Sequence, residues 1–543
     1  MSKKIITSAL PYVNNQPHLG NIIGCVLSAD VYSRYCKKNN EEAVFLCGTD
    51  EYGTAIEIEA LKKNKKPIEI CNENRIVHKK IYDWFEIKFD FFGQTTAAAH
   101  TRKVQEMFFK IYENGYFEEK TVEQYFCTKC ETFLADRYVE GTCKYCGYVA
   151  ARGDQCDGCG HTYKSTDLVD PQCTICRSIP VIKETTHLFF DFGVFKEQLE
   201  DLFKKNSKYW TDNGKAITRS WLDQELLSRC MTRDLKNKWG VPVPLKGYEN
   251  KVFYVWFDAV IGYYTFLEQL VGEDIEDWMK EGRLVQFMGK DNVFFHTIVF
   301  PSMIFATHQK LPLIERLSVT EFLLFQNEKF SKSRGHGIFG MDLVDNSCGP
   351  SDIWRYYLLK IRPERVDSNF QIKHFSQTIT ADLNNNIGNF CNRVLKYINN
   401  KCQRTILVEE ETERDIDFVR HVDKLYGQHL DLLSEIKIKD ALEKILEISK
   451  AGNEYVQKII DEKMDRKHGF SVVYSVVVLI GQVLEPFIPS ASERLLQMCN
   501  VQSQKYEKNF VLIKNNTISE NISPLFSKLD DRTLENLSAF NKF

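Results

Sequence analysis

Apolar residues near the N-terminus follow first the spacing of a strand and then that of a helix. The run KIITSAL, residues 4–10, is apolar and strand-like, and an apolar stripe at helical spacing follows it at Leu19, Ile22, Ile23, Val26 and Ala29. The run AVFLCGTDEYGT, residues 43–54, predicts a second buried strand with a polar end. This β–α–β order predicts a parallel, doubly wound α/β sheet with its site at the carboxyl ends of the strands.

The pattern changes several times farther along the chain. A cysteine-rich stretch follows residue 116, and strand-to-helix alternation returns near residue 218 in KVFYVWFDAVIGYY and LVQFMGKDNVFFHTIVF. The segment TEFLLFQNEKFSKSRGHGIFG predicts strands around a mobile loop, and long helical patterns after residue 375 predict a bundle. We therefore expect five parts: 1–116 and 218–321 as the halves of the sheet, 117–217 as an insertion, 322–374 as a connecting region, and 375–543 as an all-α domain.

Composition narrows the class of protein. A chain of 543 residues with 43% hydrophobic and 27% charged residues should fold into several soluble domains. Its net charge of −3 excludes a surface coated in positive charge, although local basic patches could still bind nucleic acid. The most apolar run, FSVVYSVVVLIGQVLEPFIPS, is interrupted by polar residues and Pro486, so it predicts a buried helix. Without a recognisable signal peptide, we expect a cytoplasmic protein with no membrane contact.

Cysteines form the most regular motif of the chain. Among 17 cysteines, eight form four CxxC units: Cys127 and Cys130, Cys143 and Cys146, Cys156 and Cys159, Cys173 and Cys176. Two such units make a tetrahedral zinc site with four thiolate ligands, so we expect two structural zinc ions rather than disulfides. Spacing alone permits sequential pairing of the units or a nested arrangement. Closed four-thiolate shells leave no position for water, which indicates a folding role rather than catalysis.

The segment PHLGN, residues 17–21, places His18 at the start of a helix. Free N–H groups at a helix N-terminus bind phosphate, yet this motif lacks the lysine of a P-loop and the spacing of GxGxxG. The imidazole of His18 would therefore be part of any nucleotide site.

A second phosphate-binding candidate lies far away in the sequence. In EKFSKSRGHG, Lys329 and Lys332 flank a serine in a run of small and cationic residues, which suits a loop that closes over a polyphosphate. Alone, such a run is more often a solvated basic turn. Its occurrence together with PHLGN and a doubly wound sheet favours the phosphate interpretation.

Together, PHLGN and KFSKS resemble the two signature motifs of class I aminoacyl-tRNA synthetases. Further segments, in chain order, are similar to methionyl-tRNA synthetases of the type with two zinc knuckles found in eukaryotes and archaea: TSALPYVNNQPHLGNIIG, CGTDEYGT, KVFYVWFDAVIGY, GKDNVFFHTIVFPSM, EKFSKSRGHGIFG and NNNIGNFCNR. The resemblance covers nearly the whole chain and weakens after about Tyr455. It implies a Rossmann-like catalytic sheet, nested zinc knuckles, a stem-contact region at 322–374 and an anticodon-binding helical domain.

The resemblance also implies an activity and its residues. ATP, with Mg²⁺, would activate L-methionine to methionyl-adenylate, which then charges tRNA(Met). The implied catalytic residues are His18, Lys329 and Lys332, and the implied ATP-binding residues are His18, Gly20, Asn21, Gly289, Asp291 and Lys332. The methionine pocket would be formed by Leu10, Tyr12, Asp50, Trp256, Ala259, Tyr263 and His296, with Arg233 helping to order the site. Asp50 would meet the ammonium group of methionine.

Anticodon reading is implied for Asn389 and Arg393, which are four residues apart and hence on one helical face. The tryptophan on which this family stacks an anticodon base should fall near Glu462, but no tryptophan follows Trp354. Either Tyr455 or another ring substitutes, or recognition depends more on hydrogen bonds.

Two other interpretations of the sequence compete with a methionine-specific synthetase. A class I synthetase for a branched aliphatic amino acid would carry a larger editing insertion, and one for cysteine would need an open zinc position. A non-catalytic RNA-binding zinc protein would be expected to have lost His18, Asp50 or Lys332, and all three are present. We expect a monomer, and the sequence leaves open whether it joins a larger synthetase assembly.

Overall fold

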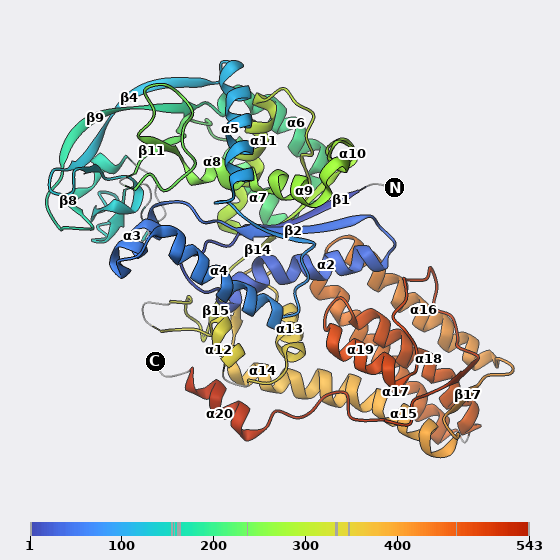
Figure 1. The fold of residues 1–543 in the computed structure, drawn as a ribbon. Coiled ribbons are helices and arrows are strands. Elements are labelled where there is room, and N and C mark those ends of the chain that lie inside the picture. The colour runs from blue at the N-terminus through green and yellow to red at the C-terminus, as the bar shows by residue number, and fades with distance from the viewer. Residues whose placement is uncertain are drawn as a thin grey trace.

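The computed structural model describes residues 3–153, 156, 158–159, 164–235, 237–331, 335–345, 348–462 and 464–540. Its centre is a five-stranded parallel sheet in the order β14-β13-β1-β2-β3. The strands are β1 (Lys4–Ser8), β2 (Ala43–Thr49), β3 (Phe91–Gln94), β13 (Arg283–Gly289) and β14 (Ile314–Thr320). The predicted doubly wound α/β fold is therefore confirmed. The insertion separates the two halves of the sheet in sequence only, and it lies to one side of the sheet (Figure 1).

Alternate residues of the central strands point to opposite faces of the sheet, as the strand period requires. Ile6 and Phe45 belong to the core shared with α2 (Leu27–Lys38), whereas Ile5 and Leu46 belong to the core shared with α9 (Gly262–Val271). Phe266 of α9 lies directly on the strands, because a Cβ at Gly48 or Gly93 would approach its ring to 2.5 or 2.3 Å. Burial on both faces explains why these strands are almost continuously apolar.

Other helices complete the two faces of the catalytic half. Between β2 and β3 lie α3 (Thr54–Lys63) and α4 (Pro67–Trp84), and after β3 comes α5 (Ala98–Glu113). The later helices are α6 (Lys196–Asn206), α7 (Asp212–Leu222), α8 (Val255–Ala259), α10 (Ile275–Glu281) and α11 (Phe300–Ala306). The apolar run at 251–253 forms β12 (Lys251–Phe253), which pairs antiparallel with β11 (Thr232–Asp234) outside the central sheet.

The insertion is built on a long antiparallel ribbon of β4 (Phe117–Cys127) and β9 (Val181–Phe190), extended by β5 (Thr132–Phe133) and β10 (Arg229–Cys230). At the far end of this ribbon is a three-stranded sheet of β6 (Val139–Thr142), β7 (Ala151–Arg152) and β8 (Val169–Cys173). This end lies beside α3 in Figure 1, so the cysteine-rich segment folds back toward the catalytic half.

After the central sheet, β15 (Leu323–Phe325) pairs with β16 (Ser368–Phe370), and α12 (Gly340–Asp345) and α13 (Ser351–Lys360) lie near them. The rest of the chain is mainly helical, as predicted (Figure 1). Its helices are α14 (Ile372–Thr378), α15 (Asn389–Lys401), α16 (Glu413–Ser434), α17 (Ile438–Asp461), α18 (Arg466–Leu484), α19 (Pro489–Met498) and α20 (Asp531–Ala539), and β17 (Thr405–Leu407) pairs with β18 (Asn515–Thr517).

The most apolar helix is α18, and by length and composition it could cross a membrane. However, 83% of its apolar window is buried inside the structure. It packs against α15, α17 and α19. The prediction of a buried core helix in this segment is confirmed.

Candidate functional site

A cleft of about 540 Å³ opens at the carboxyl ends of β1 and β2. This is the edge at which a doubly wound sheet places its ligands. Seven residues that the sequence singled out line it: Leu10, Tyr12, His18, Asn21, Asp50, Arg233 and Trp256. The cleft therefore gathers residues of both proposed pockets, for ATP and for methionine.

His18 begins the first helix, α1 (Leu19–Asn21), which continues through Ile22–Val26 into α2. Its Nδ1 accepts hydrogen bonds from the backbone N–H groups of Gly20 at 3.1 Å and Asn21 at 3.3 Å. Burial lowers the pKa of His18 to about 4, so the imidazole is neutral at physiological pH. Since Nδ1 accepts, the single proton of the neutral ring lies on Nε2, which leaves one N–H to donate.

Gly20 is required by this arrangement. A Cβ at that position would lie 3.0 Å from Cε1 of His18 and 3.1 Å from Nδ1, so a side chain would displace the imidazole.

The segment around the KFSKS motif lies against His18. The ring of Phe330 stacks on the imidazole, with centroids 4.5 Å apart and an angle of 6° between the planes. The backbone is joined as well, since Leu19 N–H donates to the Ile338 carbonyl at 3.4 Å and Gly340 N–H donates to the Pro17 carbonyl at 2.9 Å. Two segments separated by more than three hundred residues therefore meet at one helix start, as the phosphate interpretation requires.

Of the two lysines in this motif, Lys332 lies outside the described residues. Lys329 is exposed, and its ammonium group lies 5.1 Å from the ring centroid of Phe322.

Gly289 ends β13, and a Cβ there would meet no atom within 4 Å. Asp291 follows in a short turn, where burial raises the pKa of its carboxyl group and the charges of Lys290 and Lys329 oppose that rise.

Asp50 follows β2 and is buried, with 7% of its surface exposed. Its backbone is held by two hydrogen bonds, from Asp50 N–H to the Pro11 carbonyl at 3.0 Å and from Val13 N–H to the Asp50 carbonyl at 3.2 Å. Burial, and then the nearby charge of Asp258, raise the pKa of Asp50. Its Oδ1 is buried and accepts no hydrogen bond in the described part of the chain. A buried carboxylate oxygen without a donor is an acceptor suited to a ligand cation.

The remaining residues of the implied methionine pocket lie in two layers. Trp256 lines the cleft, and its ring stacks on Phe295 with centroids 3.7 Å apart and an angle of 5°. Ala259, Tyr263 and His296 are buried and do not line the cleft. The hydroxyl of Tyr263 is 2.8 Å from Nε2 of His296, whose Nδ1 is 2.8 Å from the Asn292 carbonyl.

Trp239 and Arg137 are among the cleft residues that the sequence did not indicate. Trp239 lines the cleft and donates from Nε1 to the Glu51 carbonyl at 2.7 Å. Arg137, from the insertion, lines the same cleft and is exposed. No local motif marks either residue, because each reaches the site through the fold of its own segment.

Arg233 is held by hydrogen bonds at 3.0 Å from Nη1 to the carbonyls of Cys230 and Thr232, and its guanidinium group lies 4.0 Å from the ring centroid of Tyr254.

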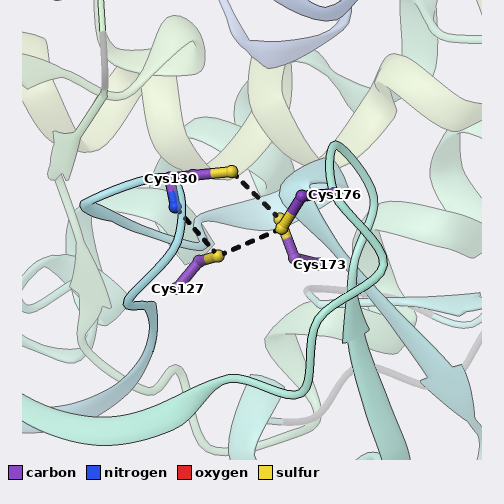
Figure 2. A group of neighbouring side chains, drawn as sticks. All are labelled: Cys127, Cys130, Cys173 and Cys176. Carbon is purple, nitrogen blue, oxygen red and sulfur yellow. Dashed lines mark hydrogen bonds between the residues drawn. The ribbon is translucent and has the colours of Figure 1, made fainter.

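The eight cysteines gather into two groups in the nested arrangement. Cys127, Cys130, Cys173 and Cys176 form one group, drawn in Figure 2, and Cys143, Cys146, Cys156 and Cys159 form the other. Within each group the sulfurs all lie within 4.8 Å of one another, with contacts of 3.4 and 3.9 Å in the first and 4.0 and 3.6 Å in the second. Four thiolates around tetrahedral zinc at about 2.3 Å lie about 3.8 Å apart, so both groups fit the ion.

We expect metal analysis of the purified chain to find about two zinc ions, and chelation to unfold the knuckles. Replacing Cys127 by serine should remove one ion, since one of four thiolates is lost, whereas replacing Cys348, a buried cysteine outside both groups, should remove none. Zinc content by mass spectrometry of the intact protein measures both. A wild-type content of one ion or none would contradict the eight-thiolate interpretation.

In the helical domain, Asn389 and Arg393 lie on α15, with Asn389 exposed and Arg393 half-buried. Tyr455 is 5% exposed, stacks on Phe418 with centroids 4.1 Å apart, and donates a hydrogen bond to Asp415. It therefore presents no free ring face to a base.

Comparison with known proteins identifies the family. The family model described as tRNA synthetases class I (M) matches residues 4–395. The chain therefore belongs to the class I aminoacyl-tRNA synthetases, as its motifs indicated. A Vairimorpha ceranae protein named "Probable methionine--tRNA ligase, cytoplasmic" is 64% identical and aligns over 99% of both chains. The human cytoplasmic methionine--tRNA ligase is 43% identical over 98% of this chain and 61% of its own length.

The fold is shared with a solved structure of the same class. The methionyl-tRNA synthetase of Mycobacterium tuberculosis in complex with methionyl-adenylate superimposes with a TM-score of 0.79 at 20% identity. The match covers 97% of this chain and 100% of the mycobacterial one.

Proposed function

We propose that the chain is a cytoplasmic methionine--tRNA ligase. It uses ATP to convert L-methionine to methionyl-adenylate and then transfers the methionyl group to tRNA(Met). The curated relatives over its full length carry this name, and the cleft holds an acceptor for an ammonium group beside a helix start suited to phosphate.

In the first step, a carboxylate oxygen of methionine attacks the α-phosphorus of ATP. A new oxygen–phosphorus bond forms, the bond to the β-phosphate breaks, and pyrophosphate leaves. The carboxylate is ionised at neutral pH, so this step needs no general base. It needs alignment of the reactants and stabilisation of the charge that develops on the phosphates.

The chain supplies these needs through His18 and the lysine motif. The N–H groups of Gly20 and Asn21 are taken by Nδ1 of His18, so the donor to phosphate oxygens is Nε2–H of His18. Lys329 and Lys332 neutralise the pyrophosphate side, where Mg²⁺ accompanies the substrate. Gly289 leaves room for the ribose, and the carboxylate of Asp291 accepts from its hydroxyl groups.

Methionine is held by a charge and by a shaped apolar wall. Asp50 accepts from the ammonium group, and Leu10, Tyr12 and Trp256 surround the thioether, with sulfur–aromatic contacts worth roughly 0.3–1.5 kcal/mol. Ala259 and the Tyr263–His296 pair support this wall from behind. Rigid support matters because shape provides the selectivity: one methylene is worth only about 1–3 kcal/mol.

One observation carries the proposal: Phe330 of the KFSKS segment stacks on His18, and His18 lines the cleft that contains Asp50. Pyrophosphate exchange, measured with each amino acid in turn, tests it. We expect exchange with methionine and little with isoleucine or cysteine. Better exchange with either of those would assign another class I specificity, and no exchange with any amino acid would indicate a non-catalytic protein.

Replacing Lys332 by alanine should cripple methionine-dependent exchange, by roughly 10²–10³-fold for the loss of one donor to developing charge. Binding of tRNA should change little, because the anticodon-reading residues proposed here lie in the helical domain. Exchange kinetics and a filter-binding assay measure the two effects. Replacing Lys310, an exposed lysine outside the cleft, is the matched control. Near-normal exchange by the Lys332 variant would contradict the proposed role of Lys332 in stabilising the pyrophosphate.

The proposed function also assigns roles to the cysteine groups and to the helical domain. Each cysteine group holds one structural Zn²⁺, which folds the insertion and takes no part in the chemistry. Asn389 and Arg393 read the edges of anticodon bases. The chain acts as a monomer, which light scattering of the purified protein would test.

A further inference from the structure

The outward face of α15 carries an unusual row of side chains. Asn389, Arg393 and Tyr397 follow one another at intervals of four residues, so they lie along one face of the helix, and Asn392 and Lys396 lie beside them. The opposite face is buried, with Phe390, Val394 and Leu395 in the core. This row offers the solvent the amide of Asn389 and the ammonium group of Lys396, together with the partly exposed Arg393 and Tyr397.

The cations of this row form no ion pair with the residues that the structure describes. In the described part of the chain, neither Arg393 nor Lys396 lies within ion-pair distance of a carboxylate. Some other cations of the bundle do form ion pairs, such as Arg420 with Asp417 on α16 and Lys444 with Glu447 on α17. Unpaired cations in a chain of net charge −3 indicate a surface that meets an anionic partner.

Tyr397 is held in a fixed orientation. Its ring stacks on Phe470 of α18, with centroids 3.8 Å apart and an angle of 18°, and Phe470 itself is 3% exposed. Phe470 is the sole ring that stacks on Tyr397 among the described residues, and Tyr397 is only half-buried. A buried ring below and a partly open ring above form a platform for a further planar group.

More positive charge surrounds this platform. Arg466 and Lys467 open α18, are exposed, and have no carboxylate within ion-pair distance in the described part of the chain. Burial, and then the nearby Cys402, raise the pKa of the Tyr397 phenol; the charge of Arg466 opposes that rise and the charge of Asp465 adds to it. The platform is therefore flanked by cations from two helices.

The two other positions considered for a base-stacking ring, Tyr455 and Glu462, offer no ring face to a base. Tyr455 is stacked and hydrogen-bonded inside the bundle. At Glu462, near which the family places its tryptophan, a carboxylate pairs with Arg414.

We infer that Tyr397 is the stacking platform for an unpaired base of the tRNA anticodon loop, in line with the amide and guanidinium groups of Asn389 and Arg393. This inference rests on the proposed function and adds a residue to it. Single-stranded RNA is bound by stacking of splayed bases on aromatic rings together with hydrogen bonds to their edges and cations near the backbone. The row on α15 provides all three.

A short RNA hairpin with the methionine anticodon CAU and 2-aminopurine in the loop tests this inference. With the wild-type chain, stacking should quench the fluorescence. Replacing Tyr397 by leucine should abolish the quenching and weaken binding roughly 5- to 150-fold, the range for loss of one base stack. Replacing Tyr397 by phenylalanine or tryptophan should preserve both, because the ring is retained.

The matched control is Tyr112→Leu, which removes a partly exposed tyrosine near Phe108 on α5, in another part of the molecule. It should leave hairpin binding unchanged. Methionine-dependent pyrophosphate exchange should be normal in all variants, since that step needs no tRNA; its absence in the wild type would instead refute the proposed function. The inference would be overturned if Tyr397→Leu bound the hairpin and quenched its fluorescence as the wild type does. It would also be overturned if Tyr397→Phe lost as much binding and quenching as Tyr397→Leu.

Discussion

Replacing His18 by alanine is expected to lower kcat/KM for methionine-dependent pyrophosphate exchange by roughly 10²–10³-fold. The reason lies in the protonation of the ring. Burial keeps the imidazole neutral, and the two backbone donors at Nδ1 fix the proton on Nε2, which donates to a phosphate as charge develops. Initial rates of exchange at varied ATP and methionine concentrations measure the loss.

The His18→Asn variant separates the two roles of the side chain. An asparagine oxygen can still cap the helix start, so folding should be kept while the Nε2 donor is lost. We expect His18→Asn to be nearly as impaired as His18→Ala. His308→Ala, which removes an exposed histidine that contacts Tyr116, should exchange normally. Full activity in His18→Asn would mean that the residue only caps the helix.

Replacing Asp50 by asparagine is expected to raise KM for methionine with a smaller effect on KM for ATP. Removing one partner of a buried charge pair typically costs about 2–5 kcal/mol, which corresponds to a loss of affinity of roughly 30-fold or more. The same change should raise the thermal stability of the free protein. Asp50 is buried, its Oδ1 accepts no hydrogen bond from the residues that the structure describes, and it lies near the charge of Asp258, so we expect its ionised form to be unfavourable until methionine binds.

The stability gain should depend on pH in a defined direction. The pKa of Asp50 is raised in the folded state, so the folded chain holds its proton to higher pH than the unfolded chain does. As pH rises above the usual carboxyl range, the wild type loses stability that the Asn variant keeps. Thermal unfolding at pH 7 and near pH 4 should show a larger difference between the two proteins at pH 7. Equal melting temperatures at pH 7, or an unchanged KM for methionine, would contradict the role of Asp50.

Much of the fold followed from local pattern. The strands predicted in the runs 4–10 and 43–54 and the buried helix predicted in the run from Phe470 are present as β1, β2 and α18, because apolar periodicity depends on which faces of each element are buried. The antiparallel pairing of β12 with β11 was not predicted, since a three-residue strand gives no signal of its partner. Arg137 and Trp239 were missed because no local motif marks either residue as part of the cleft.

The sequence by itself determined the α/β class, the four CxxC units and the two separated motifs of the synthetase, because each is written in a few neighbouring residues. Only the tertiary structure decided which cysteines share a site, that Phe330 stacks on His18, and that Ala259, Tyr263 and His296 lie behind the cleft. It also buried Tyr455 and left Tyr397 partly open. These outcomes depend on how distant elements pack against one another, and that packing is a property of the whole chain.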